Sequence, residues 1–226
     1  MLHFILAGGI CMIPLSICGI LAVAIIVERA IVLREVRAQV APFLEEFNRL
    51  IAEGKLAEAQ ELCERTPHPI SRMFSAGLLR RQEVQRGKDI SFVHGQVEAA
   101  VSEAGVHAIG MLEKRMNMLA AISNLGPLFG FMGTVTGMIS AFAAIAAAST
   151  VDVNLVASGI SEALNTTAAG LVDGIAASLG YAYFTGKIEG FVDDLQGTAN
   201  RMLAVMVKDM IKERYGAEQE GGGQAG

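Results

Sequence analysis

Two carboxylates stand in a stretch of sequence that otherwise carries no charge. Glu162 and Asp173 are the only charged residues from Val153 to Gly186, a run of 34 positions. Their spacing of 11 residues puts them at nearly the same azimuth of an α-helix, three turns apart. At the centre of a bilayer each ionised carboxylate would cost about 2.5–3.5 kcal/mol. Because the run contains no cation, we expect Glu162 to face a wet lumen or a partner helix, or to be protonated. The alternative for both acids is a structural carboxylate hydrogen-bonded at a helix interface.

Two threonines are predicted to lie at a similar depth to each other. Counted from Asp152, Thr134 and Thr167 are 18 and 15 residues into their helices. A single threonine inside a membrane helix usually bonds its own backbone and serves packing. Two threonines at one depth in the membrane, beside an acidic residue, favour a ring of polar side chains. We therefore predict an ion pathway of Thr134, Thr167 and Glu162. The secondary pore-facing candidates are Asn165, Thr166 and Asp173.

Small residues recur at four-residue intervals in the same stretches. In a membrane such a stripe lets another helix approach closely. The predicted helix-packing positions are Gly126, Gly130, Gly133, Gly137 and Gly170. Further along the chain, apolar residues from Phe184 to Val205 follow a 4-3 spacing, with Thr198 in a gap. This spacing resembles a coiled-coil seam. Both features predict a homo-oligomer.

Long uncharged runs determine the class of protein that must position these residues. There is no charged residue from Leu2 to Val27 (26 positions) or from Met116 to Val151 (36 positions). A helix needs about 20 apolar residues to cross a bilayer. We predict an all-α membrane protein with three transmembrane helices, near 8–28, 122–147 and 156–183. The first run is not typical of a cleaved signal peptide, because its first cation, Arg29, comes after the apolar run.

The positions of the cations predict the topology. All 18 Lys and Arg residues follow the first span, and none lies in the link around Ser149–Asn154. The positive-inside rule then places the N-terminus outside and the C-terminus in the cytoplasm. The formal net charge of −5 argues against nucleic-acid binding, which requires a basic face.

We expect five regions along the chain. They are a first transmembrane helix (1–33), a cytoplasmic helical hairpin region with Gly54 at its turn (34–88), a long helix containing the second span (89–150), a third span continuing into a cytoplasmic helix (151–215) and a disordered tail (216–226). The long helix would have nearly 60 residues, with any kink near Pro127. Gly216 is the expected helix stop.

No pattern in the sequence predicts catalysis or a bound metal. Cys11, Cys18 and Cys63 lack the spacing of disulfide or zinc-binding cysteines, and the 4 histidines are scattered. We therefore expect no enzyme activity, metal or cofactor.

The stretch GPLFGFMGTVTGMISAF (126–142), followed by GISEALNTTAAGL (159–171), resembles the signature of the MotA/TolQ/ExbB proton-channel family. The length, the three spans and the cytoplasmic bulk resemble its ExbB/TolQ branch. This resemblance implies an inner-membrane homopentamer around a dimer of an ExbD/TolR-like single-span partner that carries an Asp. It further implies that proton flow drives a TonB/TolA-like periplasmic effector. Thr134, Thr167 and Glu162 match the pore threonines and the buried Glu of the family.

The sequence departs from the family pattern at two positions. The family usually has Pro where this chain has Ala176, and Ala where it has Asp173. The polar stretch Asn165–Thr167 leaves sodium open as the coupling ion.

A scaffold or sensor that keeps the family fold without conduction is a further alternative. A secondary transporter is disfavoured because the three predicted spans show neither inverted repeats nor broken helices. Which energised system the protein serves stays open.

Overall fold

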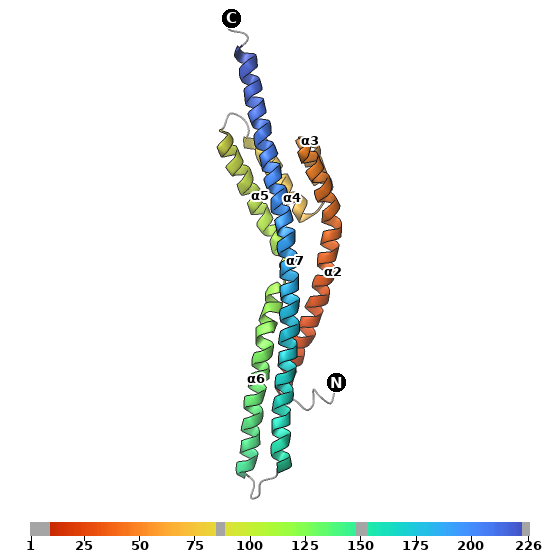
Figure 1. Ribbon diagram of the computed structural model, residues 1–226, viewed down its shortest axis with the longest axis vertical. Helices are drawn as coiled ribbons and strands as arrows, with labels where there is room; N and C mark the ends of the chain where they lie inside the picture. The colour runs from red at the N-terminus through yellow and green to blue at the C-terminus, as the bar shows by residue number, and fades with distance from the viewer. Residues whose placement is uncertain (1–9, 85–88, 148–152, 223–226) are drawn as a thin grey trace. The chain divides into compact units, whose positions relative to one another are not determined.

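The computed structural model describes residues 10–84, 89–147 and 153–222, and all regular secondary structure in that part of the chain is α-helical. The predicted all-α class is confirmed. In chain order the helices are α2 (Met12–Ala52), α3 (Leu56–Arg65), α4 (Pro69–Val84), α5 (Ile90–Leu112), α6 (Met116–Ala147) and α7 (Val153–Gly222) (Figure 1). The chain divides into two compact units. The first unit is Met1–Val32 with Lys114–Lys187, and the second unit is Leu33–Glu113 with Ile188–Gly226.

Within the described residues, two helices are long and apolar enough to cross a membrane, namely α2 and α6. Their most apolar windows have mean hydropathies of 2.3 and 1.7, and only 22% of each window is buried within the chain. The core helix of a soluble protein would bury most of such a window, so these side chains are left for lipid or another chain. The helix α7 does not reach the same apolarity, because its predicted span is rich in Gly, Ala and Thr and carries Glu162 and Asp173.

The first helix is longer than the sequence pattern predicted. We expected the first transmembrane helix to occupy 1–33 and a separate helical hairpin region to follow over 34–88. Instead α2 runs without interruption from Met12 to Ala52. No glycine lies between Gly19 and Gly54, and Pro42, although inside the helix, has an exposed side chain. The turn into α3 does fall at Gly54, whose φ of +75° is readily available only to glycine.

The predicted long helix over 89–150 is wrong, because the structure divides it. The helix α5 ends at Leu112 and α6 begins at Met116. Arg115 between them has a φ of +65°, in the left-handed region, and its carbonyl accepts the first hydrogen bonds of α6, from Met118 and Leu119. The expected weak point, Pro127, lies inside α6. The break was not evident because the residues at it include neither Gly nor Pro. The link 148–152 lies outside the described residues.

The C-terminal helix continues past its expected stop. We predicted an end at Tyr215 and a disordered tail over 216–226, but α7 extends to Gly222. A single glycine costs only about 1 kcal/mol in a helix. The residues after Gly216 are good helix formers, Ala217 to Glu220, and they carry the helix onward. The last four residues, 223–226, lie outside the described part of the chain.

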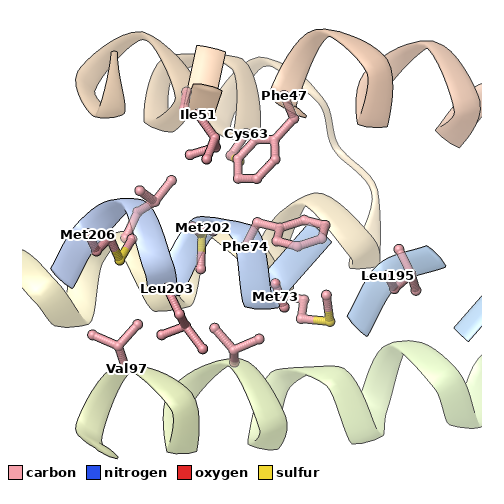
Figure 2. Packing of buried hydrophobic residues seen from close by; sticks show 14 of the residues in the cluster. Phe47, Ile51, Cys63, Met73, Phe74, Val97, Leu195, Met202, Leu203 and Met206 are labelled. Atoms are coloured by element: carbon pink, nitrogen blue, oxygen red, sulfur yellow. The ribbon is translucent and has the colours of Figure 1, made fainter. Parts of the chain in front are cut away.

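The core of the second unit buries the predicted apolar seam of α7. Its centre is an aromatic group in which the ring of Phe47 lies 5.6 Å from that of Phe43 and 4.7 Å from that of Phe74, centroid to centroid. Leu195, Met202 and Met206 of α7 belong to the same cluster (Figure 2). The 4-3 spacing therefore packs α7 within its own chain, and it is not evidence for a homo-oligomer.

Candidate functional site

The helices α6 and α7 of the first unit touch through their backbones. A Cβ on Gly126 would lie 3.0 Å from the carbonyl oxygen of Gly170, and one on Gly130 would lie 3.1 Å from the Cα of Thr167. Gly137 meets Gly159 and Ala163 in the same way. The five predicted packing glycines all lie at this contact between α6 and α7, two helices that run side by side in Figure 1. Their stripe is therefore occupied by a helix of the same chain, and it is not itself evidence for the predicted homo-oligomer.

Thr134 and Thr167 flank this glycine contact. The hydroxyl of Thr167 crosses from α7 to α6 and donates to the carbonyl oxygen of Gly130 at 2.9 Å. That carbonyl is one helical turn before Thr134, and in an α-helix it also accepts the Thr134 N–H. The hydroxyl of Thr134 donates to the carbonyl oxygen of Phe131 at 2.7 Å. Both side chains remain partly exposed. The two threonines thus lie within about one turn of each other.

The first helix packs on the opposite side of the α6–α7 pair. On α6, the hydroxyl oxygen of Thr136 lies 3.6 Å from the thiol sulfur of Cys11. Since each residue turns an α-helix by about 100°, Thr136 points about 200° away from Thr134 around the helix axis. On α7, Asp173 abuts Gly19 of α2, since a Cβ there would lie 2.8 Å from Oδ1. Asp173 is about 120° from Thr167. Among the described residues, these contacts of the first helix therefore fall on other sides of α6 and α7 than Thr134 and Thr167.

The other predicted site residues are distributed around α7. Glu162 is half-buried and lies about 140° from Thr167, on the side of Asp173 rather than of the threonines. Asn165 is half-buried on a third side. Thr166 is only 1% exposed, because its methyl group lies over Gly133. A residue covered in this way by its own chain does not line a lumen, so we leave Thr166 out of the pathway.

Sequence reasoning missed two local relationships. The first is the pairing of Gly19 with Asp173, which joins α2 to α7. The second is an ion-pair cluster in which Glu28 of α2 bonds both Arg29 and Arg115. No spacing rule reveals the Gly19–Asp173 contact or the Glu28–Arg115 pair, because the partners are distant in sequence. The presence of Gly19 within an apolar run was the only available signal.

The arrangement is suited to holding a polar group in an apolar setting. The Thr134–Thr167 edge is bordered by exposed apolar side chains, among them Phe131, Leu164 and Leu171. Within the described residues no three His, Cys, Asp or Glu side chains come together in a way that would hold a metal ion. What the edge offers is hydroxyl oxygen on an otherwise apolar surface.

Comparison with known proteins identifies the family. Residues 65–197 match the MotA/TolQ/ExbB proton channel family. The chain is 32% identical to the biopolymer transport protein ExbB of Salmonella typhimurium, over 69% of this chain and 67% of that protein. It is 27% identical to an ExbB-like biopolymer transport protein of Synechocystis, over 77% and 80% of the two chains. It is also 30% identical to the Tol-Pal system protein TolQ of Pseudomonas aeruginosa, over 61% and 60%. The chain belongs to the MotA/TolQ/ExbB proton channel family, in its ExbB/TolQ branch.

Proposed function

We propose that this chain is the pore-forming subunit of a proton-driven energy transducer in the bacterial inner membrane. Five copies form a homopentamer around a dimer of an ExbD/TolR-like single-span protein. The transmembrane helix of that partner brings an acidic group to the level of Thr134 and Thr167. Proton transfer through this group drives a TonB/TolA-like effector in the periplasm.

The observation that carries the proposal is the partly exposed hydroxyl pair beside the α6–α7 glycine contact. It is a polar spot on an otherwise apolar edge, on another side of the helix pair than these contacts of α2. In a ring of subunits with α2 on the outside, this edge faces the central space. Glu162, which is on another side of α7, is proposed to tune the proton affinity of the pathway rather than to line it beside the threonines. Asn165 and Asp173 are secondary.

The proposed topology has three spans, near 8–28, 122–147 and 156–183. The distribution of the 18 Lys and Arg residues supports an N-terminus in the periplasm and a C-terminus in the cytoplasm. The exposed apolar side chains of α2, which include Ile13, Ile17 and Ile20, are then in contact with membrane lipid.

The energy available is sufficient for such a device. Moving one charge through a potential of about 150 mV releases about 3.5 kcal/mol. This is enough to bias an equilibrium between conformations that differ by a few kcal/mol. A subunit whose helices touch through glycine backbone is rigid where they touch. It would serve as the fixed frame against which the partner moves.

Proton uptake into proteoliposomes tests the proposal. The chain is co-purified with its single-span partner and reconstituted with a pH-sensitive dye inside the vesicles, and a potassium diffusion potential is applied. We expect the dye to report acidification of the vesicle interior. This acidification should require both subunits and should be strongly reduced in the Thr134→Val, Thr167→Val double variant. Uptake that follows sodium at constant pH would favour the sodium-driven alternative. A complex that conducts neither ion would favour the scaffold or sensor.

Cross-linking tests the place of the partner independently. A cysteine at Thr167 in a background without Cys11, Cys18 and Cys63 should trap the partner's transmembrane helix. A cysteine at Ile20, on the exposed face of α2, is the control and should not. Trapping confined to Ile20 would contradict a partner in the lumen. Native mass spectrometry of the same complex in detergent checks for five copies of this chain.

A further inference from the structure

We propose that the Thr134–Thr167 edge is a hydrogen-bond acceptor surface that holds the partner's acidic group in its protonated form. This inference rests on the proposed function, and it adds to it the protonation state in which the acid is bound at this level of the pore.

The hydroxyl protons of both threonines are already committed. The hydroxyl oxygen of Thr134 lies 2.7 Å from the carbonyl oxygen of Phe131, and the hydroxyl oxygen of Thr167 lies 2.9 Å from the carbonyl oxygen of Gly130. A carbonyl oxygen has no proton, so in each pair the hydroxyl is the donor. A hydroxyl has a single proton and two lone pairs. What the two side chains still offer to an incoming group is therefore acceptor oxygen.

The surroundings supply no donor or cation in place of those protons. The sequence has no Lys or Arg from Met116 to Gly186, and the neighbouring exposed side chains Phe131 and Leu164 are apolar. The backbone N–H groups of α6 and α7 at this level are used within their own helices. An ionised carboxylate placed here would meet acceptors only. A protonated carboxyl group can donate its O–H to a threonine oxygen.

This assignment fixes the sign of a measurable effect. If the hydroxyls accept from the neutral acid, removing one destabilises the protonated form, and the acid then gives up its proton at lower pH. If instead the hydroxyls donated to the carboxylate, their removal would shift the release of the proton to higher pH. The two arrangements therefore predict opposite shifts for the same substitution.

An adjacent threonine provides a matched control. Thr166 also donates to a carbonyl oxygen, that of Glu162 at 3.0 Å, but its side chain is buried against Gly133. Thr166→Val removes the same chemical group from the same helix without changing the exposed edge. Because the Thr166 side chain is buried away from the edge, a shift that appears in Thr167→Val and not in Thr166→Val reports on the edge.

The test is the pH dependence of proton uptake by the reconstituted complex with its partner, at constant sodium. We expect the midpoint pH to fall by about half a unit to one unit in Thr134→Val and in Thr167→Val, the size of one neutral hydrogen bond. Thr134→Ser, Thr167→Ser and Thr166→Val should keep the wild-type midpoint. The corresponding Thr→Ala variants serve the same comparison if a valine variant fails to assemble.

Each other result contradicts a specific step. A midpoint that rises or does not move in Thr134→Val and Thr167→Val, with uptake still present, overturns the acceptor surface and leaves the proposed function intact. An equal shift in Thr166→Val assigns the effect to packing and also overturns it. Absence of proton uptake by the wild-type complex contradicts the proposed function, and this inference falls with it.

Discussion

Gly170 and Gly126 bring α7 and α6 into backbone contact. A Cβ on Gly170 would lie 2.5 Å from the carbonyl oxygen of Gly126 and 2.9 Å from the Cα of Gly130. Real Cβ atoms do not approach a neighbour so closely, and a helix carbonyl cannot move aside without disturbing the hydrogen bonds of its own helix. The spacing of the two helices, and with it the Thr134–Thr167 edge, depends on the missing side chain.

Gly170→Ala is therefore expected to lower the stability of the helix pair. Forcing one methyl group into a filled contact costs about 1–3 kcal/mol, and here the obstacle is backbone. Gly186→Ala is the matched control in α7, because a Cβ there would meet nothing within 4 Å. That change should be neutral, or stabilising by up to about 1 kcal/mol, since alanine favours a helix. Thermal unfolding of the detergent-solubilised protein separates the two, and equal effects would contradict the close contact.

A second prediction concerns Gly19 and Asp173. A Cβ on Gly19 would lie 2.8 Å from Oδ1 and 3.0 Å from Oδ2 of Asp173. We expect Gly19→Ala to destabilise the wild-type protein but to be tolerated once Asp173→Ala has removed the carboxylate. The double-mutant cycle should give a coupling of about 1 kcal/mol or more, as is typical of residues in contact.

Gly110→Ala is the control for this cycle. Gly110 has nothing within 4 Å of its Cβ position, so its effect on thermal stability should be the same with and without Asp173. Additive effects of Gly19→Ala and Asp173→Ala would show that α2 does not approach α7 at this point. Asp173→Ala alone should preserve proton uptake, since the carboxylate faces α2 and not the threonine edge.

Much of the fold could be predicted from composition and spacing because the signals were local. Long uncharged runs determine the apolar helices, and the turn at Gly54 follows from a glycine between two helical patterns. The break at Arg115 could not be predicted, since the residues between the two helices, 113–115, include neither Gly nor Pro. The continuation of α2 to Ala52 was missed for a different reason. Hydropathy changes where a membrane ends, and a helix need not end there.

The candidate site, like the fold, could be predicted only in part from the sequence. The depth of Thr134 relative to Thr167 followed from counting residues, and the structure places them within about one turn. The azimuth was harder to predict. Glu162 shares a helix with Thr167 but lies on another side of it, and Thr166 is buried beside Thr167. Which sides of α7 meet α6 and α2 depends on where glycines admit them, and a single sequence does not show this.

Acidic pH should weaken the α3–α4 junction through His68. Its Nδ1 accepts a hydrogen bond from the N–H of Ile70 at 3.2 Å, at the start of α4, and burial lowers the pKa of His68. Below about pH 6.5, the ordinary pKa of histidine, the unfolded chain holds a proton that the folded chain does not. Stability therefore falls from about pH 6.5 down to the lowered pKa of the folded state, and this residue adds no pH dependence above that window.

His68→Asn isolates this contribution. Asparagine also accepts a hydrogen bond at a helix N-terminus but does not titrate. Between pH 7 and pH 5 the wild-type protein should lose more thermal stability than His68→Asn, measured by unfolding in the same detergent. The same pH dependence in both proteins would indicate that His68 is free to take up a proton without losing its bond to Ile70.

The break between α5 and α6 makes a prediction whose sign depends on the backbone at Arg115. This residue has a φ of +65°, a conformation that costs a non-glycine residue about 1–2 kcal/mol. Its guanidinium bonds Glu28, but Arg115 and Glu28 are 48% and 33% exposed, and so exposed a pair contributes only about 0–1 kcal/mol. Arg115→Ala loses the pair and keeps the strain, whereas Arg115→Gly loses the pair and relieves the strain. Allowing for the greater freedom of glycine in the unfolded chain, we expect Arg115→Gly to be more stable than Arg115→Ala by about 0.5–1 kcal/mol.

If the chain instead formed one continuous helix over 89–150, Arg115→Gly would be the less stable variant by about 1 kcal/mol. The order of the two unfolding temperatures distinguishes a broken helix from a continuous one, and the ion pair does not affect the comparison because both variants lack the Arg115 guanidinium.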